Sequence, residues 1–134
     1  MEKELDLKTS YGETLKVQLE ISQYANNGCI YVGVLSQGEE GLEPYENLTV
    51  NLMDGAPDYC GYIDTNNMPE AEEFLRRNDL GYFTGLVGRS GFCTYPMYCF
   101  NVERLRELCP KGMAAYEANI EPVKEHQQNK EYSR

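Results

Sequence analysis

The stretch "TLKVQLEISQYANNGCIYVGVL", residues 14–35, indicates how this chain begins to fold. Apolar and polar residues alternate in its first half, which is typical of a strand with one buried face. The apolar positions of that face are Leu15, Val17, Leu19 and Ile21. Asn27-Gly28 suits a tight turn that needs a positive φ, and the apolar run at 29–35 predicts a central strand. The stretch therefore predicts an antiparallel hairpin inside a sheet.

Shorter strand patterns flank this hairpin. Besides 14–21 and 29–35, the predicted strands are 4–8, 46–53, 59–63 and 92–100. In 46–53 the residues Leu48, Val50 and Leu52 are expected on one side. In the last strand Cys93, Tyr95, Met97 and Cys99 are expected on one face, and Phe92, Tyr98 and Phe100 on the other. Pro96 cannot donate to a ladder, so it predicts an edge strand or a bulge there.

Two helices are expected in the second half of the chain. Asn66 or Asn67 is expected to cap the first, Glu70, Glu72 and Glu73 complement its positive end, and Gly81 is expected to stop it. Asn101 is expected to cap the second helix, which Pro110 and Gly112 should end. These elements predict an α+β fold, in which an antiparallel sheet of about five or six strands is covered on one face by two helices. We expect residues 1–112 to form a single domain and 113–134 a short helix and a flexible polar tail.

The formal charge of −10 is concentrated in the first part of the chain. Residues 1–60 hold eleven of the 22 acidic residues but only three of the 12 basic ones. Such a field disfavours direct contact with nucleic acid or an anionic membrane and favours a basic partner, although acidity also serves solubility alone. The acidic residues expected to bind such a partner are Glu39, Glu40, Glu43, Glu46, Asp54 and Asp58.

The residue inventory gives little support for catalysis, a metal or a cofactor. The single histidine, His126, is in the expected tail, and the five cysteines contain no Cys-x-x-Cys pair. We therefore expect a protein that is not an enzyme and binds neither metal nor cofactor. The weakest alternative is an enzyme that uses Asp64 with Glu70 or Glu72. An odd number of cysteines, with neither a signal peptide nor a membrane span, predicts free thiols in the cytoplasm.

A small anionic ligand is the remaining alternative. "GLVGRSGFCTYPMYCF", residues 85–100, lacks the spacing of a phosphate-binding P-loop, because Phe83 stands where that motif needs glycine. We expect 81–91 to be a glycine-rich loop, and such loops can bind anions through exposed N–H groups. The candidate ligand-binding residues are Asp64, Asn66, Asn67, Arg89, Ser90 and Tyr95, with Tyr95 stacking on a base. A protein that sequesters a nucleotide immune signal would use such a site.

Four segments resemble a known family. They are "YANNG" at 24–28, "LTVNL" at 48–52, "YIDTNNMPEAEEFL" at 62–75 and "LGYFTGLVGRSGFCTYPMYCF" at 80–100. Their order and spacing are similar to the domain of unknown function 4313, from about residue 13 to 109. That family's pattern often has Trp where this chain has Glu70.

The resemblance implies small proteins carried by mobile elements and phages of gut bacteria, with no established enzyme activity and no catalytic residues. Some small proteins of such elements block bacterial immunity, notably the Cas9 nuclease. The resemblance, together with the acidic charge, leads us to expect an anti-CRISPR-like inhibitor that occupies a basic surface of a defence nuclease. The oligomeric state cannot be predicted from these patterns.

Overall fold

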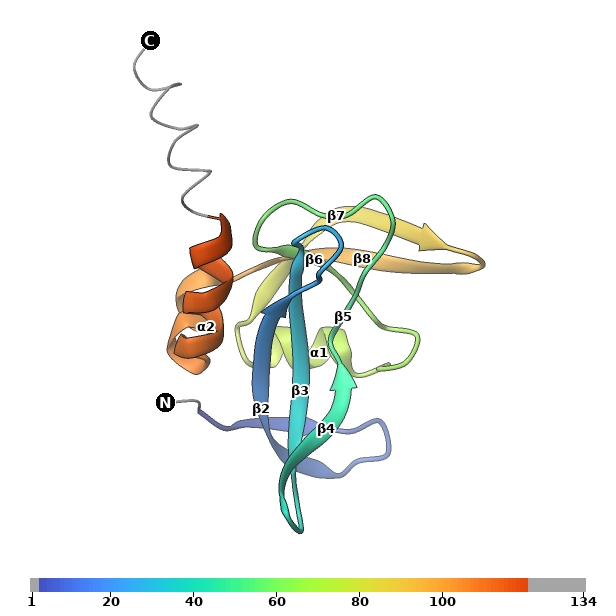
Figure 1. Cartoon of the computed structure of the whole chain (residues 1–134). Helices are drawn as coiled ribbons and strands as arrows, with labels where there is room; N and C mark the ends of the chain where they lie inside the picture. The colour runs from blue at the N-terminus through green and yellow to red at the C-terminus, as the bar shows by residue number, and fades with distance from the viewer. Residues whose placement is uncertain (1–2, 121–134) are drawn as a thin grey trace.

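The computed structural model describes residues 3–120, which form two four-stranded antiparallel sheets and three helices (Figure 1). The first sheet has the order β1 (Leu5–Lys8), β2 (Thr14–Gln23), β3 (Ile30–Gly38), β4 (Gly41–Asn47). The second has the order β5 (Thr49–Val50), β6 (Cys60–Ile63), β8 (Cys93–Phe100), β7 (Gly81–Ser90). The helices are α1 (Ala71–Arg77), α2 (Val102–Leu108) and residues 110–120. The α+β class is confirmed, whereas the expectation of one sheet of five or six strands is wrong.

The hairpin expected from 14–35 is confirmed as β2 and β3. The two strands pair antiparallel from Gln23↔Ile30 to Val17↔Ser36, and β3 is central because β4 pairs with its other edge. Gly28 has a φ of 75° and donates its N–H to the carbonyl of Tyr24, as the turn requires. The alternation in β2 thus directs its apolar face into the core.

The chain passes from the first sheet to the second at Leu48 and Thr49. The Leu48 N–H donates to the Val32 carbonyl in the first sheet, and the Leu48 carbonyl accepts from the Asp64 N–H at the end of β6. The Thr49 hydroxyl accepts from the Val32 N–H at 3.1 Å. Residues 46–53 are therefore two short segments rather than the single strand we expected.

This change of sheet also divides the apolar residues of that segment. Leu48 lies in the main core between the two sheets, whereas Val50 and Leu52 pack in a second cluster. The expectation that Leu48, Val50 and Leu52 share one side is therefore wrong. A regular strand would have kept them together, because its side chains alternate with a period of two.

The second sheet separates the main core from that second cluster. Tyr98 and Phe100 of β8 face the main core, while Tyr95 and Met97 lie in the second cluster. The second cluster consists of Leu52, Cys60, Tyr62, Tyr95 and Met97, with Val50, Ala56, Cys93 and Cys99 packed against it. The two faces expected for β8 are confirmed within the strand, but Phe92, expected beside Tyr98 and Phe100, lies in the turn and is exposed.

Helix α1 begins later and ends earlier than its sequence signals indicated. Glu70 is the N-cap and makes no capping hydrogen bond through its side chain, so the expected cap by Asn66 or Asn67 is wrong. The chain leaves the helix through Asp79, which has a φ of 57°. Gly81 is not a helix stop but the first residue of β7, where a Cβ would lie 2.7 Å from the Cys99 carbonyl oxygen. Gly81 is needed for close strand approach.

The cap of α2 and its end before Pro110 are confirmed, and the short helix expected after it is present, although it begins at 110 rather than after Gly112. The Asn101 side chain accepts from the Arg104 N–H at 3.3 Å. The helix breaks at Cys109 only and resumes over 110–120, because proline is tolerated in the first turn of a helix. Met113 and Tyr116 of this last helix are fully buried in the main core. Residues 121–134, expected as a flexible tail, lie outside the described residues.

The glycine-rich segment 81–91 is strand β7, not the loop we expected. It forms a long hairpin with β8 through a two-residue turn at Gly91-Phe92, and the register shifts between Phe83 and Val87. The shift is a β-bulge that includes Gly85, whose φ is 92°. Pro96 pairs with Val87 beside this bulge, beyond the last β8 residue that pairs with β6. Pro96 therefore fits the expected bulge position.

Candidate functional site

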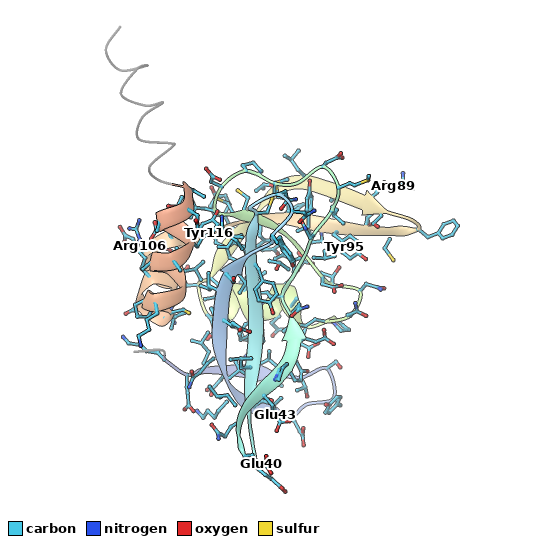
Figure 2. The ribbon with its side chains drawn as sticks, in the orientation of Figure 1. Glu40, Glu43, Arg89, Tyr95, Arg106 and Tyr116 are labelled. Atoms are coloured by element: carbon cyan, nitrogen blue, oxygen red, sulfur yellow. The ribbon has the colours of Figure 1, made fainter. Side chains whose placement is uncertain are left out.

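Four glutamates gather on the hairpin of β3 and β4, and we call Glu39, Glu40, Glu43 and Glu46 the acidic hairpin. Gly38 pairs with Gly41, so Glu39 and Glu40 are the two turn residues at the tip. Glu39, Glu40 and Glu43 are exposed, and Glu46 is half-buried. The Glu43 carboxylate lies over Gly38, where no Cβ stands in its way. Figure 2 shows Glu40 and Glu43 at one end of the molecule.

No ion pair within residues 3–120 involves a glutamate of the acidic hairpin. The ion pairs of the described chain lie elsewhere, for example Lys16–Asp6 at 2.7 Å and Arg77–Glu73 at 2.8 Å. Glu46 accepts a hydrogen bond from the Asn47 N–H at 3.3 Å, which neutralises no charge. The negative charge of this hairpin is therefore available to a partner.

Asp54 and Asp58 lie at the opposite end of β3. Their loop, 51–59, contacts the turn between β2 and β3, since a Cβ on Gly55 would lie 3.5 Å from the Cys29 sulfur. Burial, followed by the charge of Asp54, raises the pKa of Tyr62. The six acids expected to bind a partner thus form two groups rather than one face.

The candidate ligand residues are brought together only in part. The Asp64 carboxylate is 7% exposed and accepts from the Asn67 N–H at 3.1 Å and from the Asn67 side-chain amide at 3.0 Å. It lies within electrostatic range of Tyr95, whose pKa is raised by a hydrogen bond to Cys93, then by burial, and then by the charges of Cys93 and Asp64. Asn66 is exposed in the same turn. A buried carboxylate beside Tyr95 disfavours an anion there.

Arg89 lies on the other side of its hairpin. Gly88 pairs with Tyr95, and a Cβ on Gly88 would meet Tyr62 and Leu52 of the second cluster. Because side chains alternate along a strand, Arg89 faces away from that cluster and Ser90 faces toward it. Figure 2 shows Arg89 and Tyr95 on opposite sides of the β7–β8 hairpin. The cation does not join Asp64, Asn67 and Tyr95 in one site.

Sequence reasoning missed a group of exposed apolar side chains on the two faces of β7 and on its turn, which we call the apolar arm. Its members are Tyr82, Phe83, Leu86, Val87 and Phe92, all exposed, with Phe92 fully so. β7 is the last strand of its sheet, and Figure 1 shows the hairpin projecting from the body. Arg89 is the only charged residue in 81–100. The aromatic and aliphatic residues between the glycines of "GYFTGLVG" were the available signal for a strand.

The carboxylates proposed for catalysis have structural partners. Glu70 accepts from the Tyr45 hydroxyl at 2.7 Å, and Glu72 accepts from the Tyr98 hydroxyl at 2.6 Å. These bonds attach α1 to β4 and to β8, because each joins a helix carboxylate to a strand tyrosine. Burial, followed by these hydrogen bonds, raises the pKa of both tyrosines. Glu70 and Glu72 thus each have a defined structural role in holding the helix region against the sheets.

Residues 3–120 contain no group of three or more His, Cys, Asp or Glu side chains placed to hold a metal ion. His126 lies outside these residues. None of the helices in the described part of the chain is long and apolar enough to cross a membrane.

The two sheets, the short helices and the two projecting hairpins define a small α+β protein. The family described as Domain of unknown function (DUF4313) matches residues 18–120, and the chain belongs to this family. Neither a curated protein nor a solved structure matches the chain.

Proposed function

We propose that this is a non-enzymatic acidic binding protein whose acidic hairpin occupies a basic surface of a partner. One observation carries the proposal: Glu39, Glu40 and Glu43 are exposed on a projecting hairpin, and within residues 3–120 no lysine or arginine pairs with them. A concentrated charge of one sign attracts a partner of the other sign over distances of about 10 Å at moderate salt.

The partner class that fits this chemistry is a protein with a positively charged channel for nucleic acid. Cas9-type nucleases hold their heteroduplex in such a channel through its backbone phosphates. A narrow hairpin with glutamates at its tip could enter a channel of this kind and compete with the phosphates. Together with the mobile-element origin that the family resemblance implies, this leads us to propose inhibition of a bacterial defence nuclease such as Cas9.

The apolar arm offers a second contact for the same partner. Stable interfaces combine an apolar centre with a polar rim, and aromatic residues are enriched at that centre. Phe92 and Val87 supply apolar surface that charge alone does not. In this arrangement the acidic hairpin governs how fast the complex forms, and the apolar arm governs how long it lasts.

DNA cleavage by a Cas9–guide complex, measured with increasing amounts of the protein at low and high salt, tests the proposal. We expect wild type to slow cleavage at low salt, and the double variant Glu39→Lys with Glu40→Lys to lose most of this effect. The matched control is Glu4→Lys with Glu13→Lys, which changes the net charge equally at two other exposed glutamates. Equal inhibition by both variants would exclude the acidic hairpin, and no inhibition by wild type would exclude Cas9 as the target.

A further inference from the structure

Cys60 and Cys99 face each other across two strands of the second sheet. They are Cα partners in the antiparallel pair of β6 and β8. Cys60 is buried and Cys99 half-buried, and both belong to the second cluster, so their side chains lie on the same face. Burial, followed by the charge of Cys99 and its hydrogen-bonding effect, raises the pKa of the Cys60 thiol.

The hydrogen-bond pattern shows which type of cross-strand pair this is. The Phe100 N–H donates to the Tyr59 carbonyl at 2.9 Å, so the neighbouring pair Tyr59–Phe100 is a hydrogen-bonded one. Such pairs alternate along an antiparallel ladder, which makes Cys60–Cys99 a non-hydrogen-bonded pair with Cα atoms about 4.5 Å apart. Disulfides span Cα separations of about 4.4–6.8 Å. The strand register therefore gives Cys60 and Cys99 a Cα separation in the range that a disulfide can bridge.

We propose that Cys60 and Cys99 form an oxidation site, at which a hydroperoxide converts the two thiols into a cross-strand disulfide. The proposal does not depend on the proposed function. The proposed oxidation site lies at the base of the β7–β8 hairpin, because Cys99 also pairs with Tyr82 at the start of β7.

Exposure sets the order of the two steps. Cys99 is the less buried of the two thiols, so its thiolate attacks the hydroperoxide; the O–O bond breaks, and Cys99 becomes a sulfenic acid as one water or alcohol leaves. The Cys60 sulfur then loses its proton and attacks the Cys99 sulfur, the S–O bond breaks, and water leaves. Two thiols are oxidised by two electrons, and the peroxide is reduced by two.

Contacts of the two cysteines fit these roles. Cys99 raises the pKa of Tyr82, so the exposed Tyr82 side chain lies within interaction range of the Cys99 sulfur. Burial raises the pKa of Cys60 to about 12, so Cys60 stays a thiol until the sulfenic acid has formed next to it. The remaining three cysteines have other neighbours: Cys29 bonds the Ala56 backbone, Cys93 pairs with Ser90, and Cys109 is buried in the main core.

Mass spectrometry of the full-length protein after exposure to hydrogen peroxide tests the site. After blocking free thiols, we expect three alkylated cysteines where the untreated protein has five, and one cross-linked peptide pair joining Cys60 to Cys99. Thiol reduction should restore all five. Five free thiols after treatment, oxygen added without a cross-link, or a disulfide that includes Cys93 would each overturn the proposal.

Three variants test which of the two cysteines is oxidised first. Cys60→Ser should leave Cys99 as a sulfenic acid that a dimedone probe captures, whereas Cys99→Ser should bind little of the probe at Cys60. Cys93→Ser is the matched control, since it removes a half-buried thiol from the same face of β8 and should leave the Cys60–Cys99 cross-link intact. Probe capture at Cys60 equal to that at Cys99 would overturn the proposed order. The peptide map of wild type decides the site itself even if a variant folds poorly.

Discussion

The hairpins β3–β4 and β7–β8 use the same backbone device and carry opposite chemistry. Each closes through two residues, Glu39-Glu40 in one and Gly91-Phe92 in the other. The first ends in carboxylates, while the second exposes aromatic and aliphatic side chains with Arg89 as its single charge. Charge acts at a distance and is weakened by salt, whereas apolar contact acts only on touching and is not screened. The comparison teaches that one small fold can place long-range electrostatic attraction on one hairpin and short-range apolar contact on another.

The largest effect on stability should come from a glycine at the base of one hairpin, compared with a glycine at the tip of the other. Gly81→Ala places a Cβ 2.7 Å from the Cys99 backbone oxygen, which cannot rotate away, so we expect a loss of about 1–3 kcal/mol in the free energy of unfolding. In Gly38→Ala the obstacle is the Glu43 side chain, which can swing into solvent, so the loss should stay below about 0.5 kcal/mol. Urea denaturation of both variants measures the difference. Equal losses of unfolding free energy would mean that both glycine positions tolerate a Cβ equally well.

The second effect concerns self-association. High salt screens repulsion between the acidic bodies and leaves the apolar arm active, so wild type should associate more as salt rises. Replacing Phe92 by Ser and Val87 by Lys should weaken that association roughly tenfold, which corresponds to about 1.4 kcal/mol. Sedimentation velocity at low and high salt measures this. Glu39→Lys with Glu40→Lys should act in the opposite direction and raise association at low salt. Arm variants that associate like wild type would remove the adhesive role of β7.

The smallest expected effect is on stability, and it distinguishes an ion-paired carboxylate from one of the acidic hairpin. Glu117 accepts from Arg106 at 3.0 Å and from the Tyr59 hydroxyl at 2.6 Å, and Arg106 lowers the pKa of this carboxylate. Its contribution to stability is therefore present above its unfolded pKa and is lost as the pH falls through the lower folded pKa.

The variant Glu117→Gln tests this contribution. It should cost about 1 kcal/mol at neutral pH and show a shallower loss of stability below roughly pH 4.5. Glu40→Gln, in the acidic hairpin, is the control and should change stability by less than about 0.5 kcal/mol. Thermal unfolding across an acid pH series measures both. An identical acid response of wild type and Glu117→Gln would show that the Arg106 pair does not matter for folding.

Local signals predicted the local parts of this fold. The alternation in β2, the turn at Gly28 and the Asn101 cap each depend on neighbours in sequence, and all three are confirmed. The division into two sheets depends on the contact of Thr49 with Val32, which joins residues 17 positions apart. No pattern within 46–53 encodes that contact, so the segment could not be divided from its sequence alone.

Candidate-site residues were likewise predictable where they are close in sequence, and not where their positions depend on long-range contacts. The acidic hairpin was predictable because its four glutamates are close in sequence. Asp54 lies elsewhere because β3 runs the length of the sheet between them. Arg89 and Tyr95 were expected together, yet strand register decides their faces, and a shift of one residue would reverse the answer. The apolar arm escaped prediction because its glycines resemble those of a loop.

The burial of Met113 and Tyr116 bears on how the nascent chain acquires its structure. The Tyr116 hydroxyl accepts a hydrogen bond from the Tyr59 N–H at 2.9 Å. The segment around Tyr59 therefore gains this partner only after the much later Tyr116 has been synthesised. While the ribosome is still translating, β1 to β4 can pair among themselves, but their inner face has no complete cover. A chain halted before Tyr116 leaves the exit tunnel would therefore expose Ile21 and its neighbours to chaperones and proteases.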